Sequence, residues 1–259
     1  MLLPHDEAGA GPAVVLLHAG IADRSMWGEL LAPIAAAGYR AIAVDLPGFG
    51  EAPAPAEQSW WLDVIATLDA LGAGPAVLVG SSFGGAVALR VAVLAPARVR
   101  AMVLVSAPAP GLDPSERLLA AWEAEESALE RGDVDAAVAA VVDAWTLPDA
   151  PPALRERVAR MQLRAFELGL QAGEPAEAPD PLEDDDGALA SIDIPVLVAA
   201  GELDMPDFRD GAELLAARLP DARRAEIARA GHLAPLEQPD AFRDLLLGFL
   251  ERPTVSARG

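Results

Sequence analysis

Residues 80–84 read Gly-Ser-Ser-Phe-Gly and place one hydroxyl, that of Ser82, in a Gly-x-Ser-x-Gly pattern. A serine can attack a carbonyl carbon when a neighbouring base removes its proton. Residues 75–80 have the composition of a buried strand, and residues 84–89 that of the start of a helix. The pattern therefore predicts a sharp strand-to-helix turn, with small residues where strand and helix approach closely. The alternative is a glycine-rich turn with an inert serine.

A base for this serine must be an imidazole, and the chain has only three histidines: His5, His18 and His232. We expect His5 to lie at the periphery. His18 ends a predicted strand, where it is better placed to brace a loop. His232 follows the short predicted strand at residues 223–227, and a loop there can return over the sheet edge that carries Ser82. We therefore predict that His232 is the general base.

A carboxylate must hold the imidazole in the correct tautomer and stabilise the imidazolium ion. Asp204 is the best candidate, because a short turn separates it from the carboxyl end of the predicted strand at residues 195–200. Glu202, in the same turn, is the nearest rival. Three other aspartates lie at the wrong end of that strand or run into the next helix: Asp193, Asp207 and Asp210.

The elements that must position these groups follow a strand-helix alternation. Short apolar runs, too short for helices and not alternating with polar residues, predict strands buried on both faces at residues 13–17, 41–44, 76–79, 102–105 and 196–200. Helix-like stretches lie at residues 27–37, 59–71, 84–94 and 208–219. This order predicts an α/β fold with a doubly wound, mostly parallel sheet.

The alternation stops between residues 107 and 191, where no strand pattern occurs and Ala, Glu, Arg and Leu dominate. We predict a core of residues 1–106 and 192–259 with a helical cap inserted at 107–191. One apolar stripe in the cap recurs at helical spacing: Leu154, Val158, Met161, Ala165 and Leu168. The acidic, proline-containing residues 173–187 are expected to form a solvated connector, and the run at 184–186 lacks the ligand spacing of a calcium loop.

Composition excludes several classes of function. The chain has 259 residues, 53% of them hydrophobic, which suits one compact domain with an insertion. A net charge of -21 argues against nucleic-acid or anionic membrane partners. Cysteine is absent, so thiolate catalysis and cysteine-ligated zinc are excluded. No secretory signal is evident, and we expect a soluble, cytoplasmic protein.

Four segments together resemble the α/β-hydrolase superfamily over nearly the whole chain. Two of them are the serine turn and the Gly-Glu-x-Asp and Gly-His pairs around Asp204 and His232. The third, Leu-Leu-His-Ala-Gly at residues 16–20, is similar to the loop that binds the oxyanion, although Ala19 stands where glycine is usual. The fourth, residues 45–50, is similar to the family's Asp-x-Pro-Gly-x-Gly turn. The order Ser, acid, His is also that of the superfamily.

This resemblance implies a site with no cofactor and no metal. The backbone N–H groups of Gly20 and Phe83 would form the oxyanion hole, and residues 107–191 would cover the active site. The family's usual first strand would be shortened or lost, because few residues precede the strand at Ala13. An exposed sheet edge of this kind favours association, so a homodimer is one expectation.

We therefore expect a serine hydrolase that cleaves a small carboxylic ester or lactone through an acyl-enzyme. Ile21 and Leu233 are the residues best placed to contact the substrate. The alternatives are a carbon-carbon bond hydrolase, disfavoured because Leu233 stands where those enzymes commonly carry Trp, a cofactor-free haloperoxidase or perhydrolase, and a non-catalytic binding protein. Four cap residues are candidates for a pocket or simply for core: Trp122, Trp145, Met161 and Phe166.

Overall fold

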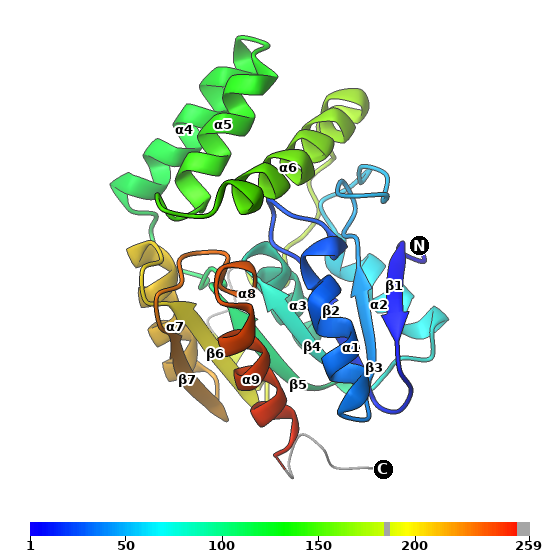
Figure 1. The fold of residues 1–259 in the computed structure, drawn as a ribbon. Helices are drawn as coiled ribbons and strands as arrows, with labels where there is room; N and C mark the ends of the chain where they lie inside the picture. The colour runs from blue at the N-terminus through cyan, green and yellow to red at the C-terminus, as the bar shows by residue number, and fades with distance from the viewer. Residues whose placement is uncertain (184–186, 253–259) are drawn as a thin grey trace.

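The computed structural model describes residues 1–183 and 187–252. Its centre is a seven-stranded sheet in the order β1-β3-β2-β4-β5-β6-β7, in which β1 is antiparallel to β3 and the other pairs are parallel (Figure 1). The strands are β1 (His5–Ala8), β2 (Ala13–Leu17), β3 (Arg40–Val44), β4 (Ala76–Ser81), β5 (Val99–Val105), β6 (Val196–Gly201) and β7 (Ala222–Ile227).

The central strands are buried on both faces, which is why their sequences are continuously apolar. Every residue of β2, β4 and β6 is buried. Side chains alternate between two cores: Val15 and Leu17 pack in one cluster, and Val14 and Leu16 in the other. Truncating one such side chain to alanine costs about 2–5 kcal/mol of folding free energy.

Helices cover both faces of this sheet, as the predicted doubly wound fold requires. The α-helices are α1 (Gly28–Ala36), α2 (Trp60–Ala70), α3 (Phe83–Leu94), α4 (Glu116–Glu130), α5 (Val134–Trp145), α6 (Pro152–Ala172), α7 (Pro206–Arg218), α8 (Ala234–Glu237) and α9 (Pro239–Leu250). Short 3-10 turns lie at Arg24–Trp27, Pro96–Arg98 and Leu189–Ser191. Helices α1 and α9 pack on one face, and α2, α3 and α7 on the other.

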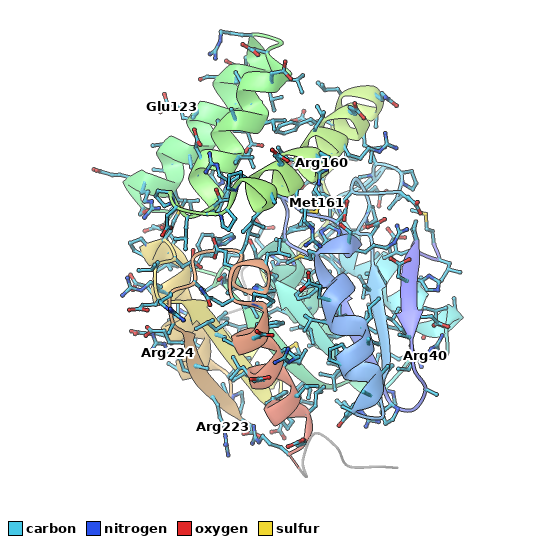
Figure 2. All side chains as sticks on the ribbon, in the orientation of Figure 1. Arg40, Glu123, Arg160, Met161, Arg223 and Arg224 are labelled. Atoms are coloured by element: carbon cyan, nitrogen blue, oxygen red, sulfur yellow. The ribbon has the colours of Figure 1, made fainter. Side chains whose placement is uncertain are left out.

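Helices α4, α5 and α6 lie together beyond the carboxyl ends of the strands, as a helical cap (Figure 1). Val158 and Met161 of the apolar stripe on α6 are buried in the same cluster as the sheet. Met161 lies on the side of α6 that faces the core (Figure 2), and its sulfur accepts a hydrogen bond from Ser25 Oγ. The stripe therefore packs the cap onto the core.

The edge strand agrees with one of the two outcomes expected from the sequence, whereas the chain end differs from the expectation. A four-residue strand, β1, does pair with β3, so an edge strand precedes Ala13 and is short rather than absent. The C-terminal helix α9 was not predicted at all. Phe242 and Leu246 on it are fully buried against the sheet.

The connector after α6 is less solvated than its composition suggests. Asp180 forms an ion pair with Arg90 of α3, and Leu182 packs into the core cluster on that face. The acidic run at residues 184–186, for which we predicted no calcium site, lies outside the described residues. Among the described helices, none is both long and apolar enough to cross a membrane.

Candidate active site

Ser82 lies at the sharp turn between β4 and α3, with φ 49° and ψ -115°. Positive φ is strained for a residue with a side chain, so this conformation persists only because its surroundings hold it. The turn needs small neighbours. A Cβ on Gly80 would collide with the backbone of Gly84, and one on Gly84 would collide with Leu17 of β2. The strand-to-helix turn predicted from the glycines is therefore present.

Three polar side chains form one continuous hydrogen-bonded chain. Ser82 Oγ donates to His232 Nε2 at 2.9 Å, and His232 Nδ1 donates to Asp204 Oδ1 at 3.0 Å. Asp204 is 4% exposed and His232 5%. In this arrangement the imidazole can take the serine proton while the carboxylate stabilises the resulting positive charge.

Parallel strand register brings these groups to one edge. Ser82 follows β4, Asp204 follows β6 and His232 follows β7, so all three stand beyond the carboxyl ends of their strands. The rival carboxylate Glu202 has another role, because it accepts a hydrogen bond from Arg229 N at 2.8 Å. The structure thus joins the residues that the sequence singled out and leaves Glu202 apart.

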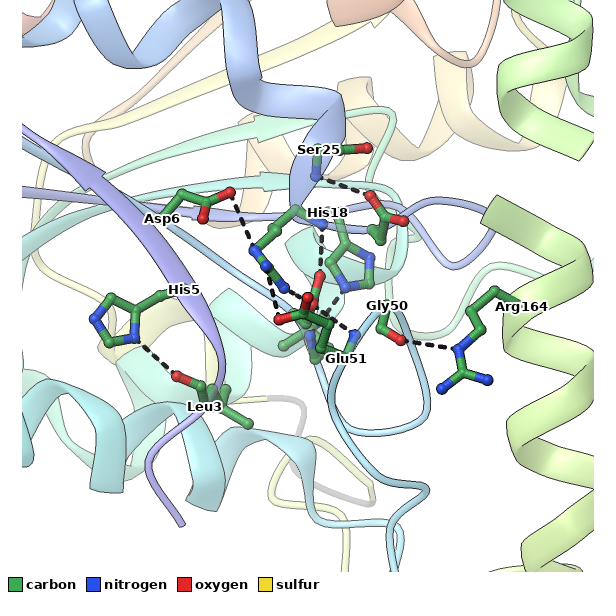
Figure 3. A network of polar contacts seen from close by, with 12 residues as sticks. Leu3, His5, Asp6, His18, Ser25, Gly50, Glu51 and Arg164 are labelled. Atoms are coloured by element: carbon green, nitrogen blue, oxygen red, sulfur yellow. Dashed lines mark hydrogen bonds and ion pairs between the residues drawn. The ribbon is translucent and has the colours of Figure 1, made fainter. Parts of the chain in front are cut away.

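The other histidines lie away from this chain of hydrogen bonds. His18 is fully buried: its Nδ1 donates to Ala19 O at 2.8 Å, and its Nε2 accepts from Leu46 N at 2.9 Å. Burial lowers the pKa of His18, so the ring is neutral and braces two loops. His5 lies on the edge strand, where its Nδ1 donates to Leu3 O at 2.9 Å (Figure 3).

Gly20 and Phe83, the expected oxyanion-hole residues, lie side by side. A Cβ added to Gly20 would stand 3.3 Å from the Phe83 Cβ. In the described part of the chain, neither backbone N–H has a hydrogen bond to another residue. Ala19, which replaces the usual glycine, is buried, and its carbonyl is held by His18. The departure at Ala19 leaves both candidate donors in place.

The loop that carries Gly20 is anchored by a buried carboxylate. Asp45 accepts hydrogen bonds from the backbone N–H groups of Arg24 and Glu51, each at 2.8 Å, and pairs with the Arg24 guanidinium. Arg24 also reaches Asp6 of β1 (Figure 3). The Asp-x-Pro-Gly-x-Gly turn therefore holds in place the loop that carries Gly20.

Above Ser82 lies a cavity of about 390 Å³ shared by core and cap. Ile21 and Trp145 line it, as expected. Leu233 does not, and that expectation is corrected: its side chain is fully buried in the core beneath the sheet edge. Of the other cap candidates, Trp122 lines the cavity, whereas Met161 and Phe166 pack in hydrophobic clusters.

Two features around His232 were missed from the sequence. The rings of Trp145 and Phe208 pack against its imidazole, with centroids 4.5 and 4.2 Å away. Glu237 accepts hydrogen bonds from Gly231 N at 2.6 Å and from Leu147 N at 3.3 Å, so it ties the histidine loop to the end of α5. Burial raises the pKa of Glu237. Its proximity in sequence to His232 was the only available signal.

The comparisons with known proteins agree with this architecture. The family model described as "alpha/beta hydrolase fold" matches residues 12–239. A 2-hydroxy-6-oxo-6-phenylhexa-2,4-dienoate hydrolase of Burkholderia cepacia is 34% identical over 95% of this chain and 90% of its own length. An epoxide hydrolase of Caballeronia sordidicola is 43% identical over 39% of this chain, and the match spans only 33% of that relative.

Solved structures show the same fold. A thermophilic esterase from Thermogutta terrifontis superposes with a TM-score of 0.80 at 26% identity, covering 96% of this chain and 92% of the esterase. Est816, described as degrading N-acyl homoserine lactones, has a TM-score of 0.76 at 26% identity over 95% of this chain and 96% of its own. With its doubly wound sheet and serine turn, this chain belongs to the α/β-hydrolase fold family.

Proposed function

We propose that this protein is a serine hydrolase that cleaves small carboxylic esters or lactones. The observation that carries the proposal is the hydrogen-bonded chain from Ser82 through His232 to Asp204, which ends in a cavity lined mostly by apolar side chains. The proposal involves no cofactor, no nucleic acid and no membrane, and it retains the cytoplasmic location expected from the composition.

In the first half of the reaction, Ser82 Oγ attacks the carbonyl carbon as its proton passes to His232 Nε2. The carbonyl oxygen becomes an oxyanion, which the N–H groups of Gly20 and Phe83 stabilise. Each such donor contributes on the order of 10²- to 10³-fold in rate. His232 then donates its proton to the leaving alkoxide, and the acyl group stays on Ser82.

In the second half, His232 removes a proton from water, and the resulting hydroxide attacks the acyl carbon. The second oxyanion collapses, Ser82 Oγ departs with the proton from His232, and the acid is released. The rings of Trp145 and Phe208 against the imidazole restrict its orientation throughout. This orientation matters because a misplaced base loses much of the advantage of proximity.

The test is hydrolysis of p-nitrophenyl butyrate by two serine variants from adjacent positions. Ser82→Ala should lower kcat by at least about 10⁴-fold. Ser81→Ala is the matched control, because Ser81 Oγ is buried in β4 with no hydrogen-bond partner in the described structure, and it should keep the activity within about two-fold. Equal loss in both variants, or loss in neither, would refute the proposal.

A carbon-carbon bond hydrolase is the second candidate, favoured by the Burkholderia cepacia relative. Two observations weigh against it. Leu233 takes the place of the tryptophan that commonly follows the catalytic histidine in those enzymes. Their dienoate substrates are anionic, and no arginine is found among the described residues that line the cavity. If the protein turned over a 2-hydroxy-6-oxodienoate faster than p-nitrophenyl esters, carbon-carbon bond hydrolysis would become the better-supported function.

Two further activities are separated by direct assays. Epoxide hydrolysis through an ester intermediate needs a carboxylate nucleophile, and the turn between β4 and α3 carries Ser82 instead. Perhydrolase activity uses the same triad and is measured as peracid formed from acetate and hydrogen peroxide. A non-catalytic binding protein would give no covalent adduct with a fluorophosphonate.

A further inference from the structure

The cap side of the cavity contains a buried amide group without a partner. Gln162 of α6 lines the cavity and is only 4% exposed, yet its Oε1 is buried and has no hydrogen-bond partner in the described structure. Buried side-chain carbonyls are nearly always hydrogen-bonded, because loss of water without a replacement is unfavourable. An apolar side chain of the same length would fill this position without that disadvantage.

The second polar group that the cap adds is Glu125 of α4. Burial raises the pKa of its carboxyl group, and no structural ion pair holds it among the described residues. The other cap residues on the cavity wall are apolar except for Asp113, which is exposed to solvent. Gln162 and Glu125 are therefore the two shielded polar groups that the cap adds to the described wall of the cavity.

The carboxylate of Asp207, which also lies on the cavity wall, is already engaged. Asp207 accepts hydrogen bonds from Ser115 N at 2.6 Å and Ser115 Oγ at 2.7 Å, which fix the start of α4 to α7. Asp207 therefore has a structural role, whereas Gln162 Oε1 has no hydrogen-bond partner in the described structure. Both available groups, Gln162 Oε1 and the Glu125 carboxyl, can accept a hydrogen bond.

We propose that Gln162 and Glu125 form a polar subsite for the substrate, and that the preferred substrates are uncharged esters or lactones with an amide N–H or a hydroxyl remote from the reacting carbonyl. The N–H or O–H donates to Gln162 Oε1, which a rotation of the side-chain amide brings to the cavity surface, because this atom is buried without a ligand. The inference rests on the proposed ester or lactone hydrolysis, since Ser82 and Gln162 line the same cavity. It excludes substrates with a remote carboxylate, which the acidic wall repels.

The test compares p-nitrophenyl esters with acyl groups of equal length. One carries N-acetyl-β-alanine, with an N–H group in mid-chain, the second carries its N-methyl derivative, and the third is the hexanoate. A parallel set built on N-acetyl-γ-aminobutyrate and heptanoate shifts the N–H group by one carbon. We expect the unaltered protein to favour one N–H ester over its N-methyl and hydrocarbon partners by on the order of ten-fold in kcat/KM.

The same measurement on Gln162→Leu identifies the group responsible. The ratio of kcat/KM for the N–H ester to that for the hydrocarbon ester should fall to about one. Circular dichroism at the assay temperature serves as the control for folding. Gln162→Met, a second apolar replacement without a branch, gives the same comparison if the leucine variant does not fold.

The outcomes separate the subsite from the reaction. Hydrolysis of all the esters with no preference for N–H, or a preference that survives in both Gln162 variants, would overturn the subsite, for example because a water molecule fills it. No Ser82-dependent hydrolysis of any ester would instead overturn the proposed function.

Discussion

The carboxyl edge of the sheet, which carries Ser82, His232 and Asp204, and the cap line the same cavity. The polar groups of the two regions differ in whether they are hydrogen-bonded. At the edge, Ser82, His232 and Asp204 are bonded to one another. In the cap, Gln162 Oε1 is buried with no partner in the described structure. A satisfied network holds the geometry that a reaction needs, whereas an unsatisfied group leaves a place for a ligand. We infer that the edge carries the chemistry and the cap the choice of substrate.

The two regions also differ in how they are held in the fold. The edge is fixed by strand register, since Ser81 pairs with Val105 and Val105 with Ala199. The cap is held by the apolar stripe on α6, by an apolar cluster that joins α4 and α5 to Phe208, and by separate hydrogen bonds, such as that from Arg164 Nε to Gly50 O at 3.2 Å (Figure 3). Changes at the edge should therefore abolish turnover, and changes in the cap should redistribute it among substrates.

The largest effect is expected from His232→Ala, which removes the base. We expect kcat for p-nitrophenyl butyrate to fall by about 10⁴-fold or more, because the serine proton has no acceptor. The matched control is His5→Ala on the edge strand β1, which should keep full activity. If the His232 variant kept more than one tenth of the kcat of the unaltered protein, the carboxyl edge of the sheet would not carry the chemistry.

The next effect distinguishes the two carboxylates after β6. Asp204→Asn should lower kcat by about 10³- to 10⁴-fold, because an amide does not hold the imidazole in the productive tautomer. Glu202→Gln removes the rival carboxylate, whose oxygen serves Arg229 N, and should change kcat less than about three-fold. A larger loss of kcat in Glu202→Gln than in Asp204→Asn would assign to Glu202 the role of holding the His232 imidazole.

A smaller effect is expected at Glu237, a positioning residue between the edge and the cap. Glu237→Gln keeps one acceptor oxygen and loses the other, so either Gly231 N or Leu147 N loses its bond. We expect kcat to fall about ten-fold with KM nearly unchanged, because the histidine loop loosens while the cavity keeps its shape.

Two measurements separate this positioning role from general destabilisation. Asp240→Asn, which alters an exposed ion pair in the same segment, should leave kcat unchanged. The Glu237→Gln protein should also remain folded at the assay temperature by circular dichroism. A rise in KM with kcat preserved would assign Glu237 to the cavity rather than to the histidine loop.

The smallest effect concerns stability, at Glu125 in the cap. Burial raises the pKa of its carboxyl group above the ordinary 4.5, so the folded state disfavours the ionised form. The resulting cost is absent below the ordinary pKa and grows as pH rises through the folded pKa. Glu125→Gln should therefore raise Tm by a few degrees at pH 8 and by nothing at pH 4. If the variant and the unaltered protein had the same Tm at pH 4 and also at pH 8, the Glu125 carboxyl would be exposed to water.

Much of the carboxyl edge of the sheet could be predicted because its sequence signals are local. The strand ends, the glycines around Ser82 and the small number of histidines each leave few candidates for the catalytic residues. Helix α9 was not predicted, although its residues Phe242 and Leu246 are fully buried. The resemblance predicted a first strand that is shortened or lost, and it is shortened. The position of β1 could not be predicted, because its His-Asp-Glu-Ala sequence has no apolar run and its pairing with β3 is a tertiary choice.

The cap side of the site could not be predicted in the same way. Which of Trp145, Met161 and Phe166 lines the cavity depends on how α5 and α6 rotate against the core, and their spacing alone does not fix this. Leu233 shows the same limit, since its side chain turns into the core although its neighbour His232 faces the cavity. The lone amide of Gln162 has no sequence signature, because an unpaired carbonyl is recognised only from its surroundings.

The most direct test of the central claim is covalent labelling of the unaltered protein with a fluorophosphonate, followed by peptide mass spectrometry. We predict a single adduct on Ser82 and none in Ser82→Ala. Labelling should slow by orders of magnitude in His232→Ala and stay unchanged in Gln162→Leu. An unlabelled protein, or an adduct on another residue in place of Ser82, would contradict the claim.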